Sequence, residues 1–142
     1  MKLAVLPAVF LLALVVAGCD NSSGGSTTAP TVAAPTTTET FTGTLAPQGL
    51  NSHNFTLAAA GTVAITLTAA GPPATITVGL GVGVPNGPTC SLSLGAGSTV
   101  AAQASTTPHI SGTSIAGGLC VAIYDIGNLL NAVDYSITVI HS

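Results

Sequence analysis

Few side chains in this sequence could do chemistry, and their spacing predicts no active site. The three histidines, His53, His109 and His141, form no pair with the spacing of a metal site such as His-x-x-x-His. Serine is plentiful, yet the Gly-x-Ser-x-Gly motif of a nucleophile elbow is absent. His53 alternates with Phe55 and Leu57, which indicates a half-buried packing histidine. We therefore expect a protein that is not an enzyme and carries no cofactor.

Oxygen-bearing side chains gather in one segment near the C-terminus. They are Asp125, Asn128, Asn131 and Asp134. Oxygen ligands from one loop could hold a calcium ion, and Asp125, Asn128 and Asp134 are the weak candidates for such a site. There is no EF-hand spacing, and two carboxylates make a poor calcium site. The pattern favours ordinary turns in which Asp and Asn side chains bond to nearby backbone groups.

The N-terminus carries the pattern of an export signal. Lys2 is the only basic residue of the chain, and the 15 residues from Leu3 to Ala17 contain no polar side chain. As a helix this run would rise about 22 Å, short of the roughly 30 Å hydrocarbon core of a bilayer. A basic start, an apolar run of this length and small residues at its end are typical of a secretory signal peptide. We therefore expect removal of residues 1–18; a retained transmembrane helix is the alternative.

The end of that run resembles the lipobox of bacterial lipoproteins, with Val16-Ala17-Gly18-Cys19 matching at all four positions. The resemblance implies cleavage before Cys19, a diacylglycerol on its sulfur, and an acyl chain such as palmitate on the new N-terminus. Several acyl chains hold a protein on a bilayer more firmly than one. An ordinary signal peptide with a chance cysteine is the alternative. We expect anchorage in the bacterial cell envelope, facing the periplasm or the cell exterior. In the lipoprotein-sorting pattern of enteric bacteria, which Asp20 matches, an aspartate after the cysteine implies retention in the inner membrane.

The cysteine count then predicts one disulfide. If Cys19 is lipidated, Cys90 and Cys120 remain as a pair. An exported protein matures in an oxidising compartment, where such pairs form disulfides. A Cys90–Cys120 bond would close a loop of about 31 residues and contribute roughly 3–4 kcal/mol in the chain-entropy model. The alternative is two buried free thiols.

Charge is almost missing after residue 18. No Lys or Arg is present there, and the acidic side chains are Asp20, Glu39, Asp125 and Asp134. Nucleic-acid binding requires Lys and Arg at the phosphates, so this class of function is excluded. Residues 19–40 are rich in Ser, Thr, Gly and Pro and have almost no bulky apolar side chains, which predicts a flexible linker. The linker is either plain or O-glycosylated.

From Phe41 onward, apolar residues alternate with Thr, Ser and Gly at the period of a β-strand. Turn residues interrupt this pattern about every 8–12 residues, and no segment has a helical period. The pattern predicts an all-β fold for residues 41–142, a single β-sandwich of about eight antiparallel strands.

Some segments allow finer predictions. Leu119 to Ile126 has few polar residues, which predicts a central strand that is apolar on both faces. Gly79 and Gly81 alternate with core residues, which predicts a bulge or close contact with another layer. Residues Ser105 to Gly112 are expected to be irregular. Three apolar residues at alternate positions are expected to face inward: Cys90, Leu92 and Leu94.

The order of several strand segments is similar to that of a known domain. The segments are Phe41-Thr-Gly-Thr-Leu45, His53-Asn-Phe55-Thr-Leu57, Ala60-Gly-Thr-Val-Ala-Ile-Thr-Leu67, Cys120-Val-Ala-Ile-Tyr-Asp125 and Asp134-Tyr-Ser-Ile-Thr-Val139. Together they resemble the bacterial pre-peptidase C-terminal domain over roughly residues 41–140. The resemblance implies a jelly-roll-like fold and an accessory role, and it carries over no catalytic residue.

These interpretations combine into one expectation about function. We expect a non-enzymatic accessory or interaction module of the envelope, bound to the lipid bilayer through Cys19. Its neutral, Thr- and Ser-rich surface would contact an envelope protein partner. The alternative is a β-sandwich module that binds a glycan or calcium.

Overall fold

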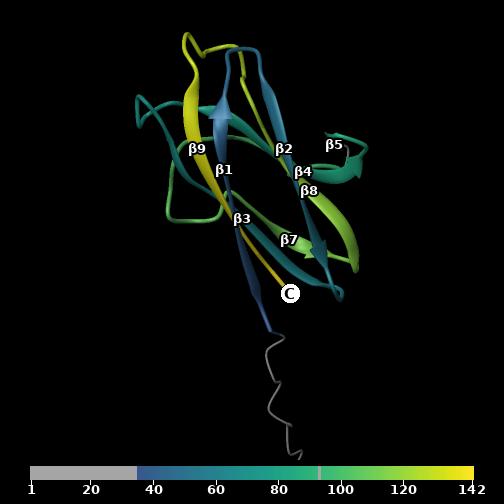
Figure 1. The fold of residues 1–142 in the computed structure, drawn as a ribbon. Coiled ribbons are helices and arrows are strands. Elements are labelled where there is room, and N and C mark those ends of the chain that lie inside the picture. The colour runs from purple at the N-terminus through teal and green to yellow at the C-terminus, as the bar shows by residue number, and fades with distance from the viewer. Residues whose placement is uncertain (1–34, 93) are drawn as a thin grey trace, which may run out of the picture. The chain divides into compact units, whose positions relative to one another are not determined.

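The computed structural model describes residues 35–92 and 94–142, which contain β-strands and no helix (Figure 1). The strands are β1 (Thr37–Leu45), β2 (Leu50–Leu57), β3 (Gly61–Gly71), β4 (Val78–Asn86), β5 (Thr89–Ser91), β6 (Thr99–Ala102), β7 (Ile110–Ser114), β8 (Gly117–Tyr124) and β9 (Val133–His141). The predicted signal peptide and residues 19–34 of the predicted linker lie outside the described residues. Within these residues no helix is long and apolar enough to span a membrane.

The strands form two antiparallel sheets, as the strand pattern predicted. One sheet has the order β1-β9-β3-β7, and the other has the order β2-β8-β4, with β5 and β6 both paired to β4. The chain passes between the sheets at six of the eight connections, which is the topology of a jelly roll. The all-β sandwich is therefore confirmed, with nine strands where the alternation predicts about eight.

The core lies between the inner faces of the two sheets. Along β9 the residues Val133, Tyr135, Ile137 and Val139 are buried and alternate with more exposed ones, as the period-2 pattern predicted. The central position predicted for the Leu119 segment is confirmed, because β8 pairs with both β2 and β4 and is buried on both faces. Burying these side chains is the main source of stability.

The first strand begins earlier than the sequence pattern predicted. β1 starts at Thr37, four residues before Phe41, and Thr37 to Thr40 pair with the end of β9. Three of these four side chains are exposed, and the fourth, Glu39, is half-buried. This extension has no apolar alternation because it contributes backbone pairing and no core side chain.

The prediction that Cys90, Leu92 and Leu94 face the core is wrong. The chain reverses at Gly87 and β5 pairs with the end of β4, so that the Ser91 backbone and the Leu92 side chain lie over Gly83 and Gly81, outside the main core. Cys90 and Leu92 pack in a small separate cluster with Cys120 and Ala122, whereas Leu94 is 50% exposed. We call Thr89–Leu92 the outer layer.

Glycines on β4 make room for side chains that cover its outer face. A Cβ at Gly79 would fall on the ring of Tyr124, and a Cβ at Gly81 would lie 2.9 Å from the Leu92 side chain. The predicted close contact with another layer is therefore confirmed at Gly81, whereas Gly79 makes room for Tyr124 of the neighbouring strand β8.

The segment from Ser105 to Gly112 was predicted to be irregular, and its last residues are instead part of a strand. β7 pairs with β3 alone, so it is the edge of its sheet. Only Ile110 of this strand is buried. A strand paired on one side and mostly exposed needs no apolar alternation, which is why the pattern missed it.

Candidate functional site

The predicted disulfide is present. Cys90 of β5 and Cys120 of β8 are bonded, with their Cα atoms 5.7 Å apart. Cys120 is fully buried, so the bond fixes the outer layer to the central strand of the sheet. Cys19 lies outside the described residues, and its lipidation stays a prediction.

Asp125 organises the loop between β8 and β9. One carboxylate oxygen accepts a hydrogen bond from the Gln48 backbone N–H at 2.8 Å, and the other accepts from the N–H groups of Gly127, Asn128 and Leu129. These hydrogen bonds favour the charged carboxylate and so lower the pKa of the Asp125 carboxyl. The bond from Gln48 has the largest effect on this pKa. Asp125 therefore makes the turn contacts that the sequence favoured and ties this loop to the turn between β1 and β2.

The other calcium candidates point to different partners. Asn128 donates from its side-chain amide to the Thr77 carbonyl at 3.0 Å, and Asp134 accepts a hydrogen bond from the Thr44 hydroxyl at 2.7 Å. In the part of the chain that the structure describes, no three His, Cys, Asp or Glu side chains are grouped so that they could hold a metal ion. Loop and strand contacts thus account for these residues, and the calcium site stays a prediction.

The lowered pKa of Asp125 predicts a loss of stability in acid. As the pH falls, the unfolded chain takes up this proton near the ordinary value of about 3.8, before the folded protein does. The stabilisation is therefore complete above that pH and is lost as the pH falls through the lower, folded-state pKa. Urea unfolding from pH 7 to pH 3 should show the stability gap between wild type and Asp125→Asn narrowing in acid. A stability gap that stays constant over this pH range would contradict a stabilising role for the ionised Asp125 carboxylate.

Two of the three histidines have structural partners. His109 accepts the Leu67 backbone N–H on Nδ1 at 3.2 Å, and its Nε2–H donates to the Gln103 carbonyl at 2.8 Å. His141 is buried at the end of β9, with Nε2 2.9 Å from a Glu39 carboxylate oxygen. Both rings therefore join separate strands or loops, and the hydrogen bonds that they make within the described residues go to backbone groups and to the Glu39 carboxylate.

The third histidine belongs to a polar network that joins β2 to β1 and β9. His53 Nε2 lies 2.8 Å from the Tyr135 hydroxyl oxygen, which also accepts a hydrogen bond from the Asn51 amide at 3.2 Å. The His53 ring stacks on Phe41 with a centroid distance of 4.9 Å and an interplanar angle of 11°. Burial lowers the pKa of His53, which favours a neutral ring near pH 7. The half-buried packing histidine of the sequence prediction is thus confirmed, but with polar partners.

A groove of about 500 Å³ runs beside this network. We call it the β1–β2 groove; its lining residues include Thr42, Asn51, Ser52, His53, Thr89 and Tyr135. No sequence signal pointed to it, because Tyr135 and His53 lie 82 residues apart on different sheets. Each appears in the sequence as an ordinary inward-facing residue of its own strand.

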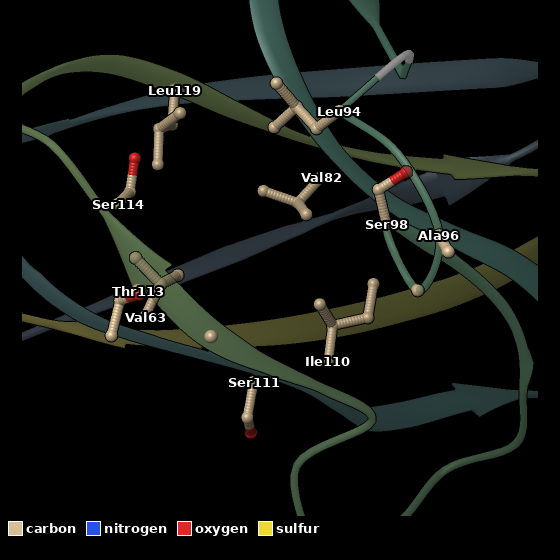
Figure 2. A pocket seen from close by; sticks show the side chains of 12 residues that line it. Val63, Val82, Leu94, Ala96, Ser98, Ile110, Ser111, Thr113, Ser114 and Leu119 are labelled. Carbon is tan, nitrogen blue, oxygen red and sulfur yellow. The ribbon is translucent and has the colours of Figure 1, made fainter.

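A second cavity, of about 180 Å³, lies beside the edge strand β7 (Figure 2). Figure 2 shows the apolar side chains of Val82, Ile110 and Leu119 converging on it. The hydroxyl of Ser98, on its wall, already donates to nearby backbone carbonyls, including that of Gly95 at 2.8 Å. The lining is mostly apolar with a few hydroxyls, from Ser98, Ser111, Thr113 and Ser114, and such a mixture selects no particular class of ligand.

These features define a class of domain: a small, disulfide-bonded β-sandwich with jelly-roll topology and a neutral polar groove at one edge. No protein-family model matches this chain, and no curated protein matches it. The resemblance to the pre-peptidase C-terminal domain therefore stays a prediction.

Proposed function

We propose that this protein is a lipoprotein of the bacterial cell envelope whose β-sandwich acts as a non-enzymatic accessory or interaction module. The observation that carries the proposal is the use of the cysteines. Cys90 and Cys120 are joined to each other, which leaves Cys19 of the Val16-Ala17-Gly18-Cys19 motif as the third cysteine of the sequence. A disulfide is also the expected state in an exported domain.

The described surface supports an interaction role for the domain. Between residues 35 and 142 the acidic side chains are Glu39, Asp125 and Asp134, and there is no Lys or Arg. Two of these carboxylates are engaged in the loop and strand contacts described above, and the third contacts His141. A partner protein in the envelope would meet a neutral face of hydroxyl, amide and apolar groups, with little electrostatic steering.

The test is the membrane partition of the wild-type protein beside Cys19→Ala. We expect the wild type to sediment with membranes and to carry the mass of a diacylglycerol and an acyl chain, since several acyl chains give firm anchoring. The variant lacks the sulfur that takes the lipid and should appear in the soluble fraction with no added mass. Cell fractionation and intact mass spectrometry measure both properties.

The matched control is Cys90→Ala with Cys120→Ala, which removes the other two thiols and leaves Cys19 in place. It should still partition with membranes. If wild type and Cys19→Ala are both soluble and unmodified, the anchor is wrong and the protein is freely secreted. Crosslinking in intact cells then addresses the interaction role, and a domain that captures no envelope protein argues against it.

A further inference from the structure

We propose that the β1–β2 groove binds a neutral, polyhydroxylated ligand such as a segment of glycan, with Asn51 and His53 as the groups that recognise its hydroxyls. The groove lies between the edge strands of the two sheets and is closed on one side by the turn between β4 and β5. The inference gives the glycan alternative a defined site. It does not depend on the lipid anchor.

The side-chain amide of Asn51 leaves an acceptor available. Its two N–H groups donate to the Thr44 carbonyl at 2.9 Å and to the Tyr135 hydroxyl at 3.2 Å. The carbonyl of Thr44 can only accept, and this fixes which end of the amide is the nitrogen. The Asn51 side-chain oxygen has no hydrogen-bond partner among the residues described, and Asn51 lines the groove.

The imidazole of His53 leaves a donor available. A phenol oxygen accepts and donates at once, so the Tyr135 hydroxyl can accept from Asn51 and give its proton to His53 Nε2, 2.8 Å away, and we assign the His53 tautomer that accepts this proton. A neutral ring that accepts at Nε2 carries its own proton on Nδ1. Within the described part of the chain this Nδ1–H has no partner, and His53 also lines the groove.

A donor and an acceptor two residues apart on one strand suit an alcohol group, which both donates and accepts. No Lys, Arg, Asp or Glu lines the groove, so a charged ligand would lose hydration without gaining an opposite charge. Thr42, Ser52 and Thr89 add hydroxyls to the walls. The chemistry of the lining therefore selects a neutral ligand with several hydroxyls.

The recognising groups are held in place before any ligand arrives. The stack of Phe41 on His53 fixes the plane of the ring, and the Tyr135 hydroxyl fixes its rotation. Gly43 permits this arrangement, because a Cβ at that position would lie 2.6 Å from the Tyr135 hydroxyl oxygen. Ordering groups in advance lowers the entropic cost of binding.

The experiment is calorimetric titration of the purified full-length chain, in a detergent without sugar headgroups. The probes are hexasaccharides of maltose, cellulose, chitin and mannan type, with a galacturonic acid hexamer as the charged comparison. We expect saturable binding of at least one neutral probe at millimolar concentration and weaker binding of the acid. No binding of any neutral probe, or tighter binding of the acid, would overturn the proposal.

Variants locate the site. His53→Phe keeps a ring against Phe41 but removes the donor, and it should weaken binding about tenfold. Thr42→Tyr fills the groove from an exposed position that makes no side-chain hydrogen bond, so it tests the site even if His53→Phe folds poorly. His109→Gln, outside the groove, should bind like wild type. Affinity that is unchanged in both His53→Phe and Thr42→Tyr would overturn the proposal.

Discussion

Replacing both Cys90 and Cys120 with alanine is expected to lower the free energy of unfolding by roughly 3–4 kcal/mol. The two residues are separated by 30 positions, and the bond between them restricts the unfolded chain over that loop. In the folded protein it also fixes the outer layer, whose strand β5 has only three residues and pairs with β4 alone. The domain should still form the sandwich, because its main core contains neither cysteine.

Urea unfolding of the double variant beside wild type measures this effect, with Cys19→Ala in both backgrounds so that no other thiol is present. Reducing agent should destabilise the wild type by a similar amount and leave the double variant unchanged. A difference below about 1 kcal/mol would show that the disulfide contributes little beyond local contacts.

Substituting Gly83 with alanine should cost about 3 kcal/mol, near the upper end of the range for overpacking. A Cβ at this position of β4 would fall on the carbonyl oxygen of Ser91, with the carbonyl carbon 2.7 Å away and the Cys90 sulfur 3.1 Å away. The obstacle is backbone and a disulfide, so no flexible side-chain end can move aside. The outer layer would have to lift from the sheet.

Gly118→Ala is the matched control on the neighbouring strand β8. A Cβ there meets only the Pro85 ring, at 3.8 Å, which is an ordinary contact. We expect the free energy of unfolding of Gly118→Ala to lie within about 0.5 kcal/mol of the wild-type value. The explanation for Gly83 makes a second prediction. Gly83→Ala should lower the free energy of unfolding by less in the Cys90→Ala, Cys120→Ala background, because the outer layer is free to move there. Equal costs in both backgrounds would place the strain elsewhere.

The outer layer also connects stability to the proposed binding site. Pro88 and Thr89 line the β1–β2 groove, and the Ser52 hydroxyl donates to the Pro88 carbonyl at 3.2 Å. Thr89 immediately precedes Cys90, so the disulfide helps to hold this wall against β2. Loosening the outer layer would therefore widen the groove and weaken the binding of any ligand that spans it.

Two predictions, the lipid anchor and the disulfide, needed only local sequence: the resemblance to the lipobox and the cysteine count. The predicted lipid anchor at Cys19 rests on a short motif alone, and no knowledge of the fold is needed to recognise that motif. The pairing of Cys90 with Cys120 followed from that motif by counting, and the structure confirms it. Both inferences use residue identity and order alone.

Sequence by itself also determined the sandwich and most of its inward faces, because a strand with one buried face must alternate and β9 shows this throughout. It could not determine where short polar strands pair, as at β7 and the start of β1, since backbone hydrogen bonds leave no mark on side-chain type. Only the tertiary structure decided that β5 folds outward over glycines and that His53 meets Tyr135. Those contacts join residues far apart in the chain, and no local pattern encodes which strands become neighbours.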